Sequence, residues 1–170
     1  MIPLSNNIME INDISIFLDY FNKIHKRSLA VMKAIPTESY NKKLSPTSLS
    51  LAELIIHIAN INLEMYGQTL RGNTSKYSGF SSENISDPIQ HYIKSYDEIV
   101  SIISSFDNND LQKKINTPAN FPITCWKWMR AMIEHEIHHR GQIYSTLNYL
   151  NIKTPPLYGL TSEEVVERSH

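Results

Sequence analysis

The sequence predicts an all-α protein, a four-helix bundle whose long helices are joined in an antiparallel or crossover-connected arrangement. Four segments carry apolar residues at the three- and four-residue spacing of a helix face, and no segment alternates as a half-buried strand does. Only 5 glycines and 8 prolines are present, and the prolines gather near the ends of those segments. With 170 residues, 41% of them hydrophobic, the chain is expected to form a single domain over 1–170.

The first two helices are expected at 9–35 and 50–71. The first is followed directly by a proline, which cannot continue a helix. Ser50 and Glu53 have the spacing of a capping box at the start of the second helix, and Gly72 is suited to end it. The apolar face of this second helix is predicted to centre near Leu54, Ile58, Ile61 and Met65.

The other two helices are expected at 87–105 and 124–150. The third begins at Ser86-Asp87-Pro88, where a capping residue precedes a proline at the first helical position. The connections 36–49 and 107–123 contain proline, asparagine and serine and are predicted to be ordered loops.

Two further segments are expected to lie outside the helices. The link 72–86 is polar and is predicted to be the most mobile connection of the chain. The tail 154–160 contains two adjacent prolines and cannot continue the fourth helix.

Composition narrows the class of protein. The 16 Lys and Arg residues nearly balance 17 Asp and Glu residues and form no basic block, so we expect no nucleic-acid partner. The amino terminus does not resemble a signal peptide, and no run of about 18 apolar residues is present, so no membrane association is expected. The single cysteine excludes an internal disulfide and fits a reducing compartment. Together these features predict a cytoplasmic protein.

The most informative motif lies in the fourth helix, where 135–142 read His-Glu-Ile-His-His-Arg-Gly-Gln. His135 and His139 are four residues apart, so their Cβ atoms lie roughly 5–6 Å from each other on one face of a helix. Two ring nitrogens at that spacing can bind one ion. Both residues border the apolar face, whereas His138 points to solvent and Gln142 lies one turn beyond His139, where it can orient that ring.

A third ligand is expected at His57, which lies in an otherwise apolar run of the second helix. A buried imidazole is costly unless both nitrogens have partners. One interpretation is a core histidine with ordinary hydrogen bonds. The other, favoured beside a four-spaced pair, is a three-histidine site with an open position, as catalytic divalent metals require. Glu53 and Glu64 flank His57 and could orient it or add a ligand.

A different interpretation takes 135–139 as the His-Glu-x-x-His motif of zinc proteases, a zinc hydrolase site. In such enzymes the glutamate activates the metal-bound water, and a downstream residue completes the site. Here Glu163 or Glu164 would be that residue instead of His57. Against this interpretation, Glu136 is directed toward the apolar face of its helix, and no alternating strand precedes it to hold a peptide.

The histidine in the second helix, followed late in the fourth by His-x-x-x-His-Arg-Gly-Gln and the Pro-Pro tail, resembles the DinB-like superfamily of four-helix-bundle metalloproteins. The resemblance covers essentially the whole chain. It implies that His57, His135 and His139 bind a divalent metal ion, nickel or zinc, and that the protein forms a homodimer. It also implies a metal-dependent transferase acting on a small-molecule substrate, with a low-molecular-weight thiol as a further cofactor. The alternative from another class is a non-catalytic, stress-associated metal-binding bundle.

The remaining candidates carry weaker signals. Cys125 lies at the start of the fourth helix, where a thiol can have a lowered pKa, but the alternative is a small buried side chain. His25 has no paired partner, and His91 and His170 are expected to be solvated. Because imidazole binds a metal only when neutral, metal binding is predicted to weaken as the pH falls through about 6.5.

Overall fold

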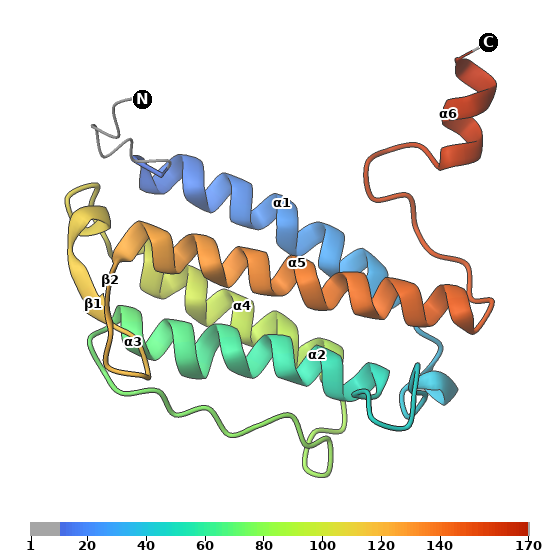
Figure 1. Ribbon diagram of the computed structural model, residues 1–170, viewed down its shortest axis with the longest axis horizontal. Coiled ribbons are helices and arrows are strands. Elements are labelled where there is room, and N and C mark those ends of the chain that lie inside the picture. Colours follow the sequence, from blue (N-terminus) through green and yellow to red (C-terminus); the bar gives the residue numbers. More distant parts are fainter. Residues whose placement is uncertain (1–10, 170) are drawn as a thin grey trace, which may run out of the picture.

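The computed structural model describes residues 11–169, and these form the predicted bundle (Figure 1). The long helices are α1 (Ile14–Lys33), α2 (Leu51–Asn60), α4 (Pro88–Ser104) and α5 (Cys125–Tyr149). α1 and α2 each pack against both α4 and α5. The segment 71–87 runs back along the bundle, so α2 and α4 point the same way and are joined by a crossover (Figure 1). The all-α bundle with crossover-connected helices is therefore confirmed.

The helix starts follow from local capping. The Asp13 side chain accepts a hydrogen bond from the backbone N–H of Ile16, so α1 begins after it rather than at the expected position, part of which lies outside the described residues. Ser50 and Glu53 form the predicted capping box of α2, and Asp87 caps α4 ahead of a proline. The starts of α1, α2 and α4 are therefore specified by neighbouring residues in the sequence, without a tertiary contact.

The second helical segment departs from a regular α-helix. After α2 the chain continues without a break into a π-helix, η2 (Ile61–Gly67), and a last turn, α3 (Gln68–Leu70). Because a π turn holds an extra residue, the buried face shifts: Asn62 and Tyr66 face the core. The expected placement of Met65 at the centre of that face is wrong, since it is only half-buried.

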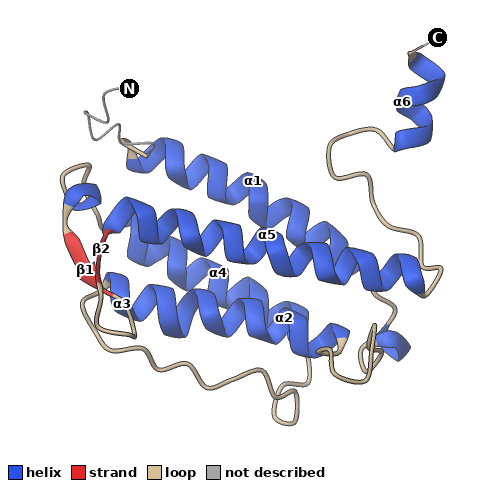
Figure 2. Cartoon of the chain, in the orientation of Figure 1, coloured by secondary structure: helices blue, strands red, loops and turns tan. Residues whose placement is uncertain are grey.

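The connections hold elements that the sequence patterns did not reveal (Figure 2). Short 3₁₀ turns occur at η1 (Thr37–Ser39) and η3 (Asp110–Gln112), and β1 (Lys114–Asn116) pairs antiparallel with β2 (Pro122–Thr124). A terminal helix, α6 (Ser162–Arg168), follows the tail. Three-residue strands are too short for alternation to show. The capping box at the start of α6 is a sequence signal that could have predicted this helix. Within residues 11–169, no helix is long and apolar enough to cross a membrane.

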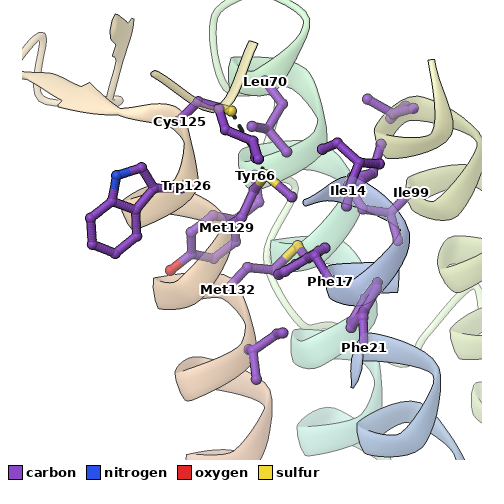
Figure 3. Packing of buried hydrophobic residues seen from close by; sticks show 14 of the residues in the cluster. Ile14, Phe17, Phe21, Tyr66, Leu70, Ile99, Cys125, Trp126, Met129 and Met132 are labelled. Atoms are coloured by element: carbon purple, nitrogen blue, oxygen red, sulfur yellow. Dashed lines mark hydrogen bonds between the residues drawn. The ribbon is translucent and has the colours of Figure 1, made fainter. Parts of the chain in front are cut away.

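The core consists of two apolar clusters separated by a polar layer. The first cluster packs the amino-terminal halves of α1 and α5 against η2, α3 and α4; it includes Phe21, Ile99 and Met129 (Figure 3). The second packs the other halves of α1 and α5 against α2 and includes Met32 and Leu147. Between them lie buried polar side chains, namely His25, Ser28, Asn62, Glu136 and Arg140. This layer lies at the level of α5 from which the predicted metal ligands project.

Candidate metal centre

The structure brings together the three histidines that the sequence singled out. His57 projects from α2, and His135 and His139 project from successive turns of α5. The Nε2 atom of His57 lies 3.2 Å from that of His135 and 3.1 Å from that of His139, and the latter two are 3.1 Å apart. Each ring is half-buried, and the three could hold a metal ion. The bundle thus closes a gap of 78 residues between two elements of one predicted site.

The protons of these rings show why three such contacts are unusual. A neutral imidazole nitrogen carries either a hydrogen or a lone pair, never both. A hydrogen bond needs one of each, so among three mutually close nitrogens at most two of the three pairs can be satisfied. An ion removes the conflict, because all three nitrogens can then present lone pairs to it. The convergence therefore suits metal coordination better than a set of core hydrogen bonds.

The spacing also fits the dimensions of a divalent ion. A point about 2.0–2.1 Å from each of three nitrogens separated by 3.1–3.2 Å subtends N–ion–N angles of about 100°. This value lies between the right angles of an octahedron and the wider angles of a tetrahedron. The three nitrogens would occupy one side of the ion and leave the other side open.

The far nitrogens of two rings have partners that fix their orientation. Nδ1 of His57 lies 2.6 Å from the hydroxyl oxygen of Tyr77, and Nδ1 of His139 lies 2.8 Å from Oε1 of Gln142. The amide oxygen of Gln142 can only accept a hydrogen bond, so Nδ1 of His139 carries the hydrogen and the lone pair of the ring lies on Nε2. The expected role of Gln142 agrees with this geometry. Nδ1 of His135 is buried and has no hydrogen-bond partner among residues 11–169.

The carboxylates expected to orient His57 serve other purposes. Glu53 closes the capping box of α2 and lies 3.3 Å from Nζ of Lys43. Glu64 accepts a hydrogen bond from the backbone N–H of Ser78. The prediction that either contacts His57 is wrong, because the π turn and the following segment give that place to a tyrosine. Periodicity does not predict this contact; the signal for it in the sequence is an aromatic residue, Tyr77, inside an otherwise polar link.

Burial makes the three imidazoles poor bases. Desolvation, with the neighbouring rings adding to it, lowers the pKa of His57 to about 4 and that of His135 to about 3. Burial also lowers the pKa of His139, against the hydrogen bond with Gln142, which raises it. The rings of His57 and His135 are therefore neutral well below pH 6.5. The pH at which His57 and His135 take up a proton therefore lies below the value of about 6.5 that is usual for imidazole.

The residue arrangement of a zinc protease is contradicted. Glu136 is 0% exposed and is bound inside the core, where its carboxylate accepts hydrogen bonds from Ser28, Tyr92 and Asn62. It cannot activate a water at the histidine group. Glu163 and Glu164 lie on α6, outside that group, and Glu164 caps its own helix.

The histidines outside the group differ in burial and in hydrogen-bond partners. His138 is exposed, as predicted. His25 is 7% exposed, stacks on Tyr96 at 3.6 Å between ring centroids and places Nδ1 3.0 Å from the hydroxyl of Tyr92. The prediction for His91 is wrong, since it is half-buried with Nε2 2.6 Å from Oδ1 of Asn60. His170 lies outside the described residues.

Cys125 behaves as a small buried side chain. It is 1% exposed, and burial raises the pKa of its thiol to about 12. The lowered pKa that a helix start could have produced is therefore wrong, because desolvation outweighs the helix dipole here.

Aromatic rings surround the histidine group on two sides. Tyr66 packs against Trp128 and lies 6.3 Å from the ring of His135. Phe80 presents an edge-to-face contact to His57 at 6.4 Å. Such rings lower the local polarity and limit the access of water.

Comparison with known proteins agrees with this architecture. The sequence model of the DinB superfamily matches residues 20–143, a range that includes all three histidines. An uncharacterized protein of Bacillus subtilis strain 168, YjoA, is 25% identical over 149 residues, covering 85% of this chain and 93% of YjoA.

Two solved structures share the fold. The crystal structure of a DinB-like protein from Bacillus cereus ATCC 10987 superposes with a TM-score of 0.70 at 20% identity, over 86% of this chain and 99% of the other. The crystal structure of YjoA, also described as DinB-like, gives a TM-score of 0.70 at 20% identity, over 83% and 96% of the two chains. At this identity the likeness speaks for the fold alone.

Proposed function

The chain belongs to the DinB superfamily, and we propose that it binds a divalent metal ion through Nε2 of His57, His135 and His139. The observation that carries the proposal is the convergence of three neutral ring nitrogens whose mutual contacts cannot all be hydrogen bonds. Imidazole ligands suit nickel and zinc, the ions that the family resemblance implies. The three ligand side chains are neutral imidazoles, so the ion would carry the only full charge in this group.

An open coordination position distinguishes catalytic from structural metal sites. In the described part of the chain, the group holds three ligand residues and no fourth. The carboxylate of Glu64 accepts a hydrogen bond from Ser78, and that of Glu136 accepts hydrogen bonds inside the core. A site with three protein ligands leaves room for water or a substrate atom.

The residues around the site have definable tasks. Gln142 and Tyr77 hold the rings of His139 and His57. Tyr66 and Trp128 form an apolar wall beside His135, which excludes water and strengthens electrostatic interactions within the site. A divalent ion bound there would act as a Lewis acid that lowers the pKa of a thiol or water.

We propose that the reaction is a metal-dependent transfer to or from a small molecule, with a low-molecular-weight thiol as co-substrate. Support for the thiol comes from the family resemblance, and support for a Lewis acid comes from the three-ligand geometry. The alternative is a non-catalytic protein in which the ion ties α2 to α5. The two differ in whether an added ligand can reach the metal.

The first experiment measures metal content. Untagged wild-type protein is analysed for bound metal beside His57→Ala, with His138→Ala as the matched control. His138 is exposed on α5, the helix that carries His135 and His139, and lies outside the group, so its removal tests for non-specific binding by surface histidines. We expect about one ion per chain in the wild type and the control. Full occupancy in His57→Ala would overturn the three-histidine site.

The second experiment separates the two roles of the ion. Cobalt(II) is bound in place of the native metal, and its visible spectrum is recorded while a small thiol is added. A thiolate-to-cobalt charge-transfer band would support the transferase, because it requires an open position. An unchanged spectrum at saturating thiol would favour the non-catalytic alternative.

A further inference from the structure

The link 72–86 passes close to the proposed metal site, and hydrogen bonds to α2 and η2 fix its middle part, 76–80. The backbone N–H groups of Lys76 and Ser78 donate to the backbone oxygen and the carboxylate of Glu64, at 2.8 and 2.6 Å. The side chain of Asn60 donates to the backbone oxygen of Gly79 at 2.8 Å. We call 76–80 the strap. The mobility expected for this link stays a prediction, but the strap within it has hydrogen-bond anchors of its own.

The strap anchors are themselves held in place. Asn60 is 6% exposed, and its Oδ1 lies 2.6 Å from Nε2 of His91 on α4. Glu64 lies in the π-helix, so the extra residue of that turn helps to set where its oxygens meet the strap. Bonds to residues on both sides of Tyr77 therefore fix the backbone from which its phenol projects.

The phenol of Tyr77 reaches a nitrogen of a predicted metal ligand. Its oxygen lies 2.6 Å from Nδ1 of His57, the nitrogen opposite to the one that faces the other two histidines. Phe80, at the end of the strap, lies edge-on to the same ring. His57 is thus held by the strap on one side and faces the ligand group on the other.

We propose that Tyr77 is a positioning residue of the metal site and that the strap exists to place it. Its phenol oxygen accepts the Nδ1–H of His57, which fixes the tautomer with a lone pair on Nε2. The phenol proton can turn to solvent, because Tyr77 is 36% exposed. The inference rests on the proposed metal function. It extends that function to a residue 20 positions beyond the ligand, in a segment without regular secondary structure.

The test compares Tyr77→Phe with Tyr149→Phe. Both changes remove one phenol oxygen, and Tyr149 is exposed at the far end of α5. Zinc(II) affinity is measured by competition with a chromophoric chelator. Loss of a partner that orients a ligand typically costs about 10-fold in metal affinity. We expect a weakening of that order in Tyr77→Phe and wild-type affinity in Tyr149→Phe.

Two further measurements detect a change that ordinary destabilisation would not produce. In metal-loaded wild type, the Nδ1–H of His57 should give a slowly exchanging proton signal in nitrogen-15 NMR spectra, and this signal should exchange rapidly in Tyr77→Phe. The cobalt(II) spectrum should also shift in this variant alone. Asn60→Ala, which removes the anchor at Gly79 without changing charge, should accelerate the same exchange.

The outcomes separate the two proposals. If wild-type protein binds no zinc, the proposed function fails and the inference fails with it. If the wild type binds zinc and Tyr77→Phe binds it within twofold, only the positioning role is overturned. Unchanged exchange in Asn60→Ala would refute the claim that the anchor at Gly79 helps the strap to hold the phenol.

Discussion

Replacement of Glu136 tests how much the buried hydrogen bonds between the helices stabilise this bundle. Its carboxylate is 0% exposed, accepts from Ser28 and Tyr92 at 2.7 Å each and from Asn62 at 2.9 Å, and interacts with the charge of Arg140. These partners lie on every long helical segment of the bundle. We compare Glu136→Gln with Glu136→Leu, which have similar volumes but differ in their acceptors.

The two variants are expected to differ because of Asn62. Its Oδ1 is buried and has no hydrogen-bond partner among the described residues. In Glu136→Gln, a rotated Asn62 amide can accept from the new side-chain N–H₂, while the glutamine oxygen still accepts from Ser28 and Tyr92. In Glu136→Leu, Ser28 keeps the carbonyl of Ile24, but the side-chain N–H₂ of Asn62 loses its acceptor among the described residues.

The magnitudes follow from these contacts. Burial raises the pKa of Glu136, because desolvation of the carboxylate outweighs its hydrogen bonds and the attraction to Arg140, so a neutral glutamine in its place loses no net electrostatic stabilisation. Glu136→Leu leaves a buried amide unpaired, about 1–3 kcal/mol, and weakens the bonds of Ser28 and Tyr92. We expect the free energy of unfolding to fall by about 3 kcal/mol more in Glu136→Leu than in Glu136→Gln.

Urea unfolding of metal-free protein, followed by circular dichroism at pH 8 with a chelator present, measures both values. The comparison is valid if the free energy of unfolding falls with urea concentration at the same slope in the wild type and both variants. Equal destabilisation of the two variants would refute the reasoning, since it would mean that Asn62 does not exchange its donor for its acceptor. A leucine variant as stable as the wild type would show that the buried carboxylate contributes nothing.

Three further results are expected. Burial lowers the pKa of His25 from 6.5 to about 4, so the fold favours the neutral ring; the stability this gives above pH 6.5 is lost as the pH falls toward 4. Between pH 8 and 5, urea unfolding of metal-free wild type should therefore lose about 2 kcal/mol more than that of His25→Gln, and an identical loss would contradict the burial effect. The thiol of Cys125, with a pKa raised to about 12, should resist an aromatic disulfide reagent at pH 8 until urea unfolds the protein; rapid labelling of the native state would be inconsistent with its burial. Zinc at about 100 times its dissociation constant should stabilise the wild type by about 2.7 kcal/mol and His135→Ala hardly at all, and an equal gain in both would place the ion elsewhere.

Local patterns were sufficient for much of this architecture. The capping residues Asp87 and Ser50 act within three positions of themselves, so helix starts could be predicted without tertiary information. The π turn was not predictable in the same way. It has no periodic signature of its own, and Gly67 in it allows an approach to α4 at which an added Cβ would meet Ile99 at 3.0 Å.

For the site, the sequence by itself determined that His135 and His139 share one helical edge, because residues four apart must do so. It also indicated that His57, in an apolar run, needed partners, and family resemblance joined the three. Only the tertiary structure decided which nitrogens converge, since that depends on the packing of α2 against α5. The tertiary structure alone decided that Tyr77 rather than a glutamate contacts His57, because periodicity in the sequence does not predict a hydrogen bond between two separate segments.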